Sequence, residues 1–377
     1  MEIKKVQRII ASVTRTILGA VFVFSGFVKA IDPLGTTYKI EDYLKAFGGF
    51  FTDLLPLAAP AAWGLILLEL LLGVCLLFNI RTNWTAWLSF AFYCVMTPLT
   101  LYIALKNPVS DCGCFGDAIV LTNWQTFWKN VILISLVIIL LCTKKSLYQT
   151  WTGTAEFIIT LASLLFAIAF MLWSITHLPV KDFRPYKVGN NIPALMEIPD
   201  DAEPDQYEIA LIYEKDGVEQ TFTLQNYPKG DSTWTFVDQK SKLIKKGYEP
   251  PIHDFELLTM NFDDITYDVL ESEEPVTLVI MYDLTKTDRN QLPKLKALYE
   301  ENLQISESSN LPIRFVTGSG EDDIYAFAAE LGWDEMTTEE VFCTCDPVTL
   351  KTIVRANPGV IIVQNGTIID KYNLRNK

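Results

Sequence analysis

The chain has 377 residues with a formal net charge of −14, and half of its residues are hydrophobic. Residues 1–180 hold 12 Lys/Arg against 9 Asp/Glu, whereas residues 181–377 hold 19 against 36, so an apolar, nearly neutral half precedes an acidic one. The negative charge of the second half disfavours nucleic acid and anionic lipid headgroups as its partners.

Five apolar segments reach the length of about 20 helical residues that a bilayer requires. They are residues 9–31, 55–80, 84–105, 119–142 and 157–180. The fourth segment contains Asn123 and Lys129, so its uninterrupted apolar run begins only at Val131. Because no small-residue cleavage site follows the first segment, we interpret it as a span and not as a removed signal peptide.

Basic residues are unevenly distributed over the predicted loops. One side of the membrane carries Lys4, Lys5, Arg8, Arg81, Lys144 and Lys145. The opposite side carries Lys29, Lys39, Lys45 and Lys106. Since basic loops favour the cytoplasm, the bias predicts a cytoplasmic N-terminus. Five spans then place the C-terminal half outside, so we expect a multi-pass protein of the inner (cytoplasmic) membrane whose C-terminal domain is periplasmic or extracytoplasmic.

Two charged residues lie at membrane depth. Arg15 is in the first span and Glu69 is near the middle of the second. Charges inside a membrane are costly unless they are paired, so we predict an ion pair between Arg15 and Glu69. The alternative is a proton or quinone site. Residues 40–54, between these spans, have apolar positions at helical spacing and predict a short interfacial helix.

The segment after the fifth span predicts a linker and then a β-rich extension. Residues 177–193 contain prolines, charges and Gly189, as expected of an extended linker. Residues 207–213 and 218–224 flank an Asp216-Gly217 turn, which is a strong hairpin signal. Residues 233–238 predict a third strand.

From about residue 247 the pattern alternates between strands and helices. Residues 276–282 are continuously apolar, which is typical of a central strand buried on both faces. The other predicted strands are residues 313–316, 341–345, 360–363 and 367–372, and the predicted helices are residues 288–301 and 322–331. The pattern indicates an α/β domain that ends in a β-hairpin.

Seven cysteines are present, and four of them form two Cys-x-Cys pairs. The other three, Cys75, Cys94 and Cys142, lie in spans, where a thiol packs as a small apolar residue. Both pairs are predicted to face the oxidising compartment, where thiols tend to become disulfides.

The first pair, Cys112 and Cys114, lies in a loop with Gly113 and Gly116, which permit a tight backbone. A bridge across one intervening residue closes a small, strained ring, and strained disulfides are the exchangeable ones. This favours a redox pair. A permanent loop staple and a metal site are the alternatives, and no histidine is nearby, since His177 and His253 are the only two.

The second pair, Cys343 and Cys345, falls in a predicted strand. Residues i and i+2 of a strand point to one face, with α-carbons about 6.5–7 Å apart. That separation is at the limit for a disulfide. The two residues are therefore either buried strand cysteines or a thiol pair that exchanges with the membrane loop.

The loop and the first two spans resemble known membrane proteins. The Cys-Gly-Cys-Phe-Gly sequence at 112–116, with Trp124, Phe127 and Asn130 after it, is similar to the MauE group of DoxX-like proteins. Further matches to the DoxX pattern are Arg15, Gly19, Ser25-Gly26, Lys29, Asp32-Pro33 and Glu69. The resemblance covers roughly residues 8–145 and implies a four-helix bundle. MauE is associated with maturation of the disulfide-rich methylamine dehydrogenase, so the resemblance implies thiol chemistry. Nothing in this chain points to methylamine.

The C-terminal domain resembles a thioredoxin-fold module of the TlpA type. Residues 248–255 are similar to the start of that fold, and Pro358 occupies the place of its cis-proline. Residues 282–290 depart from the family, because the expected Cys-x-x-Cys after the first central strand is missing.

These observations predict an α-helical membrane bundle followed by an α/β domain. The expected parts are a DoxX/MauE-like four-helix bundle (1–148), a fifth transmembrane helix (149–180), a linker with a β-rich extension (181–246) and a thioredoxin-like domain (247–377). The expected function is extracytoplasmic thiol–disulfide maintenance, which would make the chain a thiol–disulfide oxidoreductase. Its partners would be the lipid bilayer and a periplasmic client or thiol partner.

Two alternatives remain at this point. The first is a non-catalytic membrane-anchored binding or scaffold protein in which Cys112 and Cys114 form a structural staple. The second is a quinone-linked electron-transfer component, with Glu69 and Arg15 near the quinone headgroup. Apart from that quinone, we expect no cofactor and no metal.

Overall fold

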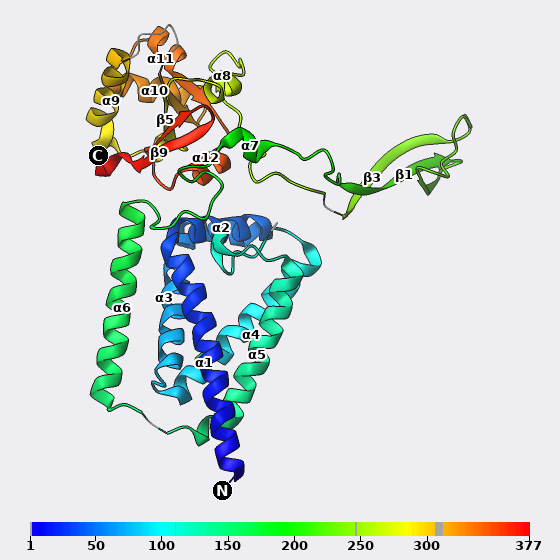
Figure 1. Cartoon of the computed structure of the whole chain (residues 1–377). Coiled ribbons are helices and arrows are strands. Elements are labelled where there is room, and N and C mark those ends of the chain that lie inside the picture. Colours follow the sequence, from blue (N-terminus) through cyan, green and yellow to red (C-terminus); the bar gives the residue numbers. More distant parts are fainter. Residues whose placement is uncertain (1, 110, 149, 246, 306–311) are drawn as a thin grey trace.

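The structure is a computed structural model that describes residues 2–109, 111–148, 150–245, 247–305 and 312–377. Figure 1 shows a bundle of long helices, a C-terminal α/β domain above it and a β-sheet arm that extends to one side. The N-terminus lies at the end of the bundle away from the C-terminal domain. The predicted domain limits at 149 and 246 fall on residues outside this description.

Within the described residues, five helices are long and apolar enough to cross a membrane, which confirms the predicted number. They are α1 (Glu2–Ile31), α3 (Ala58–Leu77), α4 (Thr82–Lys106), α5 (Asn123–Thr143) and α6 (Gly153–Thr176). A 3₁₀ segment, η1 (Gly49–Leu57), leads into α3, and short 3₁₀ turns η2 (Gly116–Ala118) and η3 (Lys144–Ser146) flank α5. The chain therefore carries several membrane-spanning helices.

The interfacial helix begins earlier than predicted. Helix α2 runs from Pro33 to Phe47, not over residues 40–54, and lies across the end of the bundle beneath the C-terminal domain (Figure 1). Its start is set by Asp32, whose carboxylate accepts a hydrogen bond of 2.9 Å from Gly35 N, and by the proline at the first helical position. Its end is set by Gly48, with φ at 64°.

Helix α5 also differs from its prediction, because it begins at Asn123 and not at residue 119. Thr122 and Gln125 form a capping box: the Thr122 hydroxyl accepts from Gln125 N, and the Gln125 side chain accepts from Thr122 N. The residues before it therefore remain in the loop that contains Cys112 and Cys114.

Helices α1 and α3 pack closely because small residues lie at their contact. A Cβ on Gly26 would lie 2.9 Å from Leu70 N, and one on Gly73 would lie 2.6 Å from Val23 N. The same contacts show that the two helices run antiparallel, with Gly19 opposite Leu77 and Gly26 opposite Leu70. This register decides which charged residues meet inside the bundle.

The C-terminal domain is built on a six-stranded sheet of order β4-β7-β6-β5-β8-β9. Its strands are β4 (Leu258–Thr259), β5 (Val276–Met281), β6 (Ile313–Thr317), β7 (Phe342–Thr344), β8 (Gly359–Gln364) and β9 (Thr367–Asn373). β5, β6 and β7 are parallel, whereas β8 and β9 are antiparallel to their neighbours. All six residues of β5 are buried, as predicted for a central strand.

Helices cover both faces of this sheet. The side chains of α9 (Leu292–Ile305) and α10 (Glu321–Leu331) share a core with Val279 and Met281. Those of α7 (Ile192–Met196), α8 (Thr266–Leu270) and α12 (Pro347–Ile353) share the core on the opposite face. The remaining short elements are α11 (Glu335–Val341), η4 (Leu284–Lys286), η5 (Arg289–Gln291) and η6 (Leu374–Asn376).

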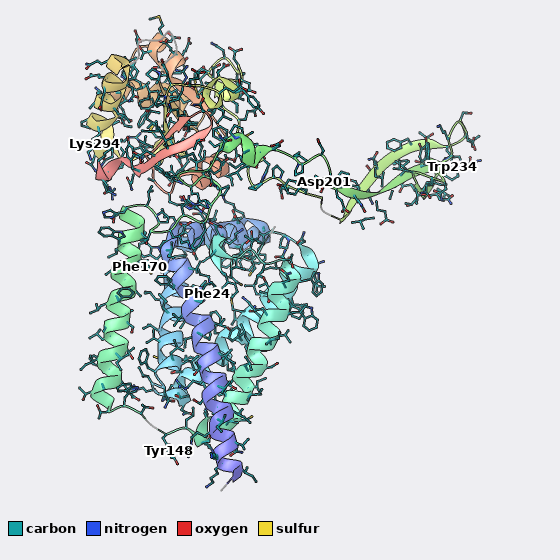
Figure 2. The ribbon with its side chains drawn as sticks, in the orientation of Figure 1. Phe24, Tyr148, Phe170, Asp201, Trp234 and Lys294 are labelled. Carbon is teal, nitrogen blue, oxygen red and sulfur yellow. The ribbon has the colours of Figure 1, made fainter. Side chains whose placement is uncertain are left out.

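The arm is a three-stranded antiparallel sheet of order β2-β1-β3. Its strands are β1 (Gln206–Lys215), β2 (Val218–Thr223) and β3 (Thr235–Lys245), which confirms the three predicted strands. Figure 2 shows Trp234 on the arm, well away from the rest of the molecule. Its ring packs edge-on against Phe222, with centroids 5.1 Å apart.

Candidate functional site

The loop between α4 and α5 brings Cys112 and Cys114 together. Gly113 has φ at 63°, in the left-handed region that glycine adopts without strain, and its carbonyl accepts from Gly116 N at 3.0 Å. This turn sets the two Sγ atoms 3.0 Å apart. Cys112 is buried and Cys114 is half-buried. The two sulfurs are thus adjacent, which the predicted redox pair requires.

Helices α1 and α2 hold this loop by three hydrogen bonds, and a fourth lies within the loop. Lys39 of α2 contacts the Asp111 carboxylate at 2.9 Å, and that carboxylate accepts from Gly113 N at 2.8 Å. The Tyr43 hydroxyl donates to the Cys112 carbonyl at 2.7 Å. The Ser25 hydroxyl of α1 donates to the Cys114 carbonyl at 2.8 Å. The position of the thiols therefore depends on the bundle and not on the loop alone.

Glu69 is paired with Lys29, and the predicted Arg15–Glu69 pair is wrong. Lys29 Nζ lies 2.9 and 2.7 Å from the two oxygens of the Glu69 carboxylate, and it donates to Ser25 Oγ at 2.7 Å. Both charged residues are buried. Since Ser25 in turn donates to Cys114, a continuous hydrogen-bonded chain links the intramembrane ion pair to the thiol loop.

Arg15 lies at the other end of α3. It donates to the Leu77 carbonyl at 2.8 Å and to the Leu76 carbonyl, where a cation complements the C-terminal end of the helix. The antiparallel register explains the error. Arg15 and Lys29 are 14 positions apart, which is about 21 Å along a helix. Of these two residues, Lys29 is the one at the level of Glu69.

The two thiols have opposite shifts in pKa. The hydrogen bond between the two sulfurs lowers the pKa of Cys114 to about 6, against the effect of burial and with help from the positive charges of Lys129 and Lys29. The same hydrogen bond, together with burial, raises the pKa of Cys112 well above its usual range. These opposite shifts favour Cys114 over Cys112 as the sulfur that becomes a thiolate.

Asp111 and Asp117 flank the thiols, and a nearby negative charge opposes a low thiol pKa. The structure pairs each with a cation: Asp111 with Lys39 at 2.9 Å, and Asp117 with Arg355 at 3.7 Å. Lys129 approaches the same loop, with Nζ 4.5 Å from the centre of the Phe115 ring. The cations near the loop thus offset its two carboxylates.

A cavity of about 90 Å³ borders both thiols. Apolar side chains of the bundle form one wall, including Val28, Leu65, Met96 and Leu99. Lys29, Tyr43, Cys112 and Cys114 form the polar wall. Residues 179 and 181–184, which follow α6, also line the cavity. The thiol pair therefore faces a small cavity that the linker to the C-terminal domain partly covers.

Cys343 and Cys345 are in a different environment. Cys343 lies in β7, Cys345 follows it, and both side chains belong to the buried core beneath the sheet. Burial raises the pKa of Cys343 to about 11 and that of Cys345 to about 12. Neither residue lines the cavity beside the membrane loop. The arrangement fits the interpretation as buried strand cysteines.

The Asn357–Pro358 peptide bond is cis, as predicted. The Asn357 side chain donates to the Asp283 carbonyl at 2.8 Å, and the Asn357 carbonyl accepts from Asp288 N at 3.3 Å. The segment that lacks the expected Cys-x-x-Cys therefore lies directly against this proline turn. At its start, the Tyr282 ring meets the Tyr38 ring of α2 edge-on, with centroids 6.4 Å apart.

Lys29 and Arg355 are the two residues whose roles the sequence did not reveal. Lys29 was noted only as a basic residue on one side of the membrane and as part of a family pattern. Pairing it with Glu69 depends on the register of α1 against α3, which the packing of the two helices sets. Arg355 forms an ion pair of 2.8 Å with Asp32, a residue more than 300 positions earlier, and no local pattern indicates that contact.

Comparison with known proteins identifies two stretches of the chain. Residues 7–143 match the family model described as methylamine utilisation protein MauE, which supports the predicted MauE resemblance over the first four spans. Residues 207–246, which correspond closely to the arm, match a domain of unknown function, DUF8463. No curated protein and no solved structure matches. The DoxX and thioredoxin resemblances stay predictions.

Proposed function

We propose that this membrane protein exchanges thiols and disulfides with partner proteins through Cys112 and Cys114. The observation that carries the proposal is the 3.0 Å approach of the two Sγ atoms in a loop that borders a cavity. The pair lies at the end of the MauE-like helical bundle that faces the C-terminal domain. A partner outside the bilayer therefore reaches it without crossing the membrane core.

The exchange has two steps. The Cys114 thiolate attacks one sulfur of a partner disulfide, forming a mixed disulfide and releasing the other partner sulfur as a thiolate. Cys112 loses its proton to that thiolate and attacks Cys114 Sγ, forming the Cys112–Cys114 disulfide and releasing the second partner thiol. The partner gains two electrons and the loop pair loses them. The reverse sequence oxidises a partner dithiol.

The surrounding side chains support these roles. Lys129 and Lys29 favour the thiolate at Cys114, and the hydroxyls of Tyr43 and Ser25 hold the two cysteine carbonyls in place. None of these side chains needs to bond to the partner. Their contribution is to keep the attacking and the resolving sulfur at a distance at which either can react.

An extracytoplasmic position of the site completes the proposal. The start of α1, the turn between α3 and α4 and the segment between α5 and α6 lie at the end of the bundle opposite the C-terminal domain (Figure 1). These segments contain Lys4, Arg81 and Lys144, and the positive-inside rule therefore favours the cytoplasm at this end. Tyr148 is at that same end (Figure 2). The thiol loop and the C-terminal domain then share the oxidising compartment, where disulfide exchange occurs.

The C-terminal domain supports this function without carrying its chemistry. Its parallel β5-α9-β6 unit and the cis-proline before β8 agree with the thioredoxin-type resemblance. Residues 282–290 contain no cysteine, and Cys343 and Cys345 are buried thiols. We therefore assign this domain to partner or bundle contacts. The same lack of exposed thiols favours the second candidate, a non-catalytic scaffold in which Cys112 and Cys114 form a fixed staple.

Trapping of mixed disulfides tests the proposal. Cys112→Ser removes the resolving thiol, so adducts through Cys114 should accumulate on non-reducing gels of whole membranes and disappear in the Cys112→Ser/Cys114→Ser double variant. Cys343→Ser is the matched control and should give no adducts. If neither Cys112→Ser nor Cys114→Ser traps a partner and the wild-type pair is always oxidised, the scaffold is correct. A quinone role would be lost in Glu69→Gln and would not need either cysteine.

A further inference from the structure

We infer that the C-terminal domain is a lid over the cavity at Cys112 and Cys114, and that Arg355 is the latch that holds it shut. The biological purpose of such a lid rests on the proposed function, whereas the contacts that define it do not. A shut lid keeps the thiol pair from non-specific thiols and disulfides, and an open lid admits a partner.

The latch joins three parts of the chain through one side chain. Arg355, directly after α12, places Nε 2.8 Å from a carboxylate oxygen of Asp32 and Nη2 3.7 Å from Asp117. Asp32 is the junction of α1 and α2, and Asp117 lies three residues after Cys114. Only 8% of the Arg355 side chain is exposed. A cation shielded from water between two carboxylates is strongly held there, and removing it leaves both carboxylates without that partner.

Aromatic rings extend the contact across α2. The Arg355 guanidinium lies 5.3 Å from the centre of the Tyr38 ring, and Lys351 Nζ lies 4.8 Å from the same ring and 5.6 Å from that of Tyr282. Tyr38 is thus covered by two cations and one ring of the C-terminal domain. The domain therefore contacts the same helix, α2, whose Lys39 and Tyr43 hold the loop of Cys112 and Cys114.

Residues 181–184, which line the cavity and are called its roof below, are bonded to α12, the helix that ends two residues before Arg355. Arg184, which lines the cavity, donates to the Thr352 carbonyl of α12 at 2.8 Å and pairs with Asp182 at 2.8 Å. Asp182 also contacts Lys371 of β9 at 2.6 Å. Residues 181–184 are therefore fastened to the C-terminal domain, and a movement of α12 away from α2 would lift the roof from the thiols.

The lid must open for the proposed exchange. A cavity of about 90 Å³ has room for a few waters and none for a partner polypeptide. The contacts that join the C-terminal domain to the bundle are ion pairs, cation–ring contacts and hydrogen bonds, such as those of Asn373 and Asn376 to the Thr176 carbonyl of α6. Interfaces of this polar kind between domains of one chain are the ones that separate reversibly.

Thiol labelling with two sizes of reagent tests the lid on the full chain in membrane vesicles. After mild reduction, labelling of Cys112 and Cys114 is followed by mass spectrometry with a small maleimide and with a maleimide carrying a polyethylene glycol chain. In the wild type the large reagent should react far more slowly than the small one. Arg355→Ala should raise the rate of the large reagent about tenfold or more, as expected when a shielded charge pair is broken. The rate of the small reagent should rise by a much smaller factor, because it needs less opening of the cavity than the large one does.

Two further variants keep the test decisive if Arg355→Ala unfolds. Asp117→Asn weakens the latch from the side of the bundle and should raise the large-reagent rate several-fold. Arg375→Ala removes an ion pair with Asp288 of 2.9 Å inside the C-terminal domain and should leave the rate unchanged. If folded Arg355→Ala and Asp117→Asn are labelled like the wild type by both reagents, there is no latch. A labelling change without trapped partners would instead refute the exchange function and leave the lid.

Discussion

The two Cys-x-Cys pairs have the same spacing and opposite surroundings. In the membrane loop, a glycine in the left-handed region folds the backbone back, and the Sγ atoms of Cys112 and Cys114 approach to 3.0 Å. In β7 and after it, the extended backbone points Cys343 and Cys345 into the core of the C-terminal domain. The intervening residue and its conformation, and not the spacing, therefore decide whether the two sulfurs of a Cys-x-Cys pair approach each other.

The two cysteine pairs also differ in the charged side chains around them. Lys29 and Lys129 lie near Cys114 and help to lower its pKa, whereas burial raises the pKa of Cys343 and of Cys345. Of the two pairs, the loop pair is therefore the one whose surroundings favour a thiolate. Four experiments test this contrast.

The largest expected effect is in thiol accessibility. In native, reduced membranes a small impermeant maleimide should label Cys114 readily. Cys343 is 1% exposed, and its labelling requires the domain to open, so it should react more slowly by a factor of about 1,000 or more. Peptide mass spectrometry over time measures both rates. Detergent denaturation is the control and should equalise them. Similar rates in native membranes would remove the contrast.

The second-largest effect is expected on stability, from breaking the Lys29–Glu69 ion pair beneath the loop. Lys29→Met leaves the Glu69 carboxylate buried and unpaired, which should cost about 3–5 kcal/mol of stability. Arg15→Met should cost only about 1–2 kcal/mol, because Arg15 bonds backbone carbonyls. Thermal unfolding in detergent measures both, and Lys29→Met/Glu69→Leu should recover most of the loss. A coupling between Arg15 and Glu69 in a double-mutant cycle would contradict the structure.

The pH dependence of labelling tests the lowered pKa of Cys114. Since the thiolate is the reactive form, the labelling rate should be full above pH 7 and fall about tenfold per unit below pH 6, whereas an ordinary thiol would fall from about pH 8.5. Lys129→Met should move the midpoint of this pH profile upward by about one pH unit. Lys145→Met, at the opposite end of the bundle, should not move it. A midpoint near 8.5 in the wild type would show that the loop does not stabilise the thiolate.

The smallest effect concerns the loop backbone. Gly113→Ala imposes a side chain on a left-handed residue and sets its Cβ 2.9 Å from Lys39 Cγ, a strain of about 1–2 kcal/mol that should disfavour the close approach of the sulfurs. Titration of the pair with glutathione buffers measures the shift. Gly217→Ala carries the same kind of strain in the β1–β2 turn of the arm, with φ at 79°, and should leave the titration unchanged. Equal behaviour of the two variants would mean that the Gly113 turn does not control the pair.

Much of the fold was predictable because its signals are local. Five apolar segments, the apolar run of β5 and the Asp216-Gly217 hairpin each depend on a few neighbouring residues, and each was confirmed. The boundaries of α2 and α5 were wrong because caps, and not apolar spacing, set where those helices begin. The caps Asp32 and Thr122 are visible in the sequence, so a closer search for them would have found both starts.

The site was only partly predictable. The sequence by itself determined the number of spans, the glycine turn between the thiols and the absence of a Cys-x-x-Cys from residues 282–290, because each is a property of adjacent residues. Only the tertiary structure decided that Glu69 meets Lys29 and not Arg15, and that Arg355 reaches Asp32 and Asp117. Those partners are set by the antiparallel packing of α1 on α3 and by the placement of α12 on α2. Such long-range contacts depend on how whole elements fit together, which no local pattern encodes.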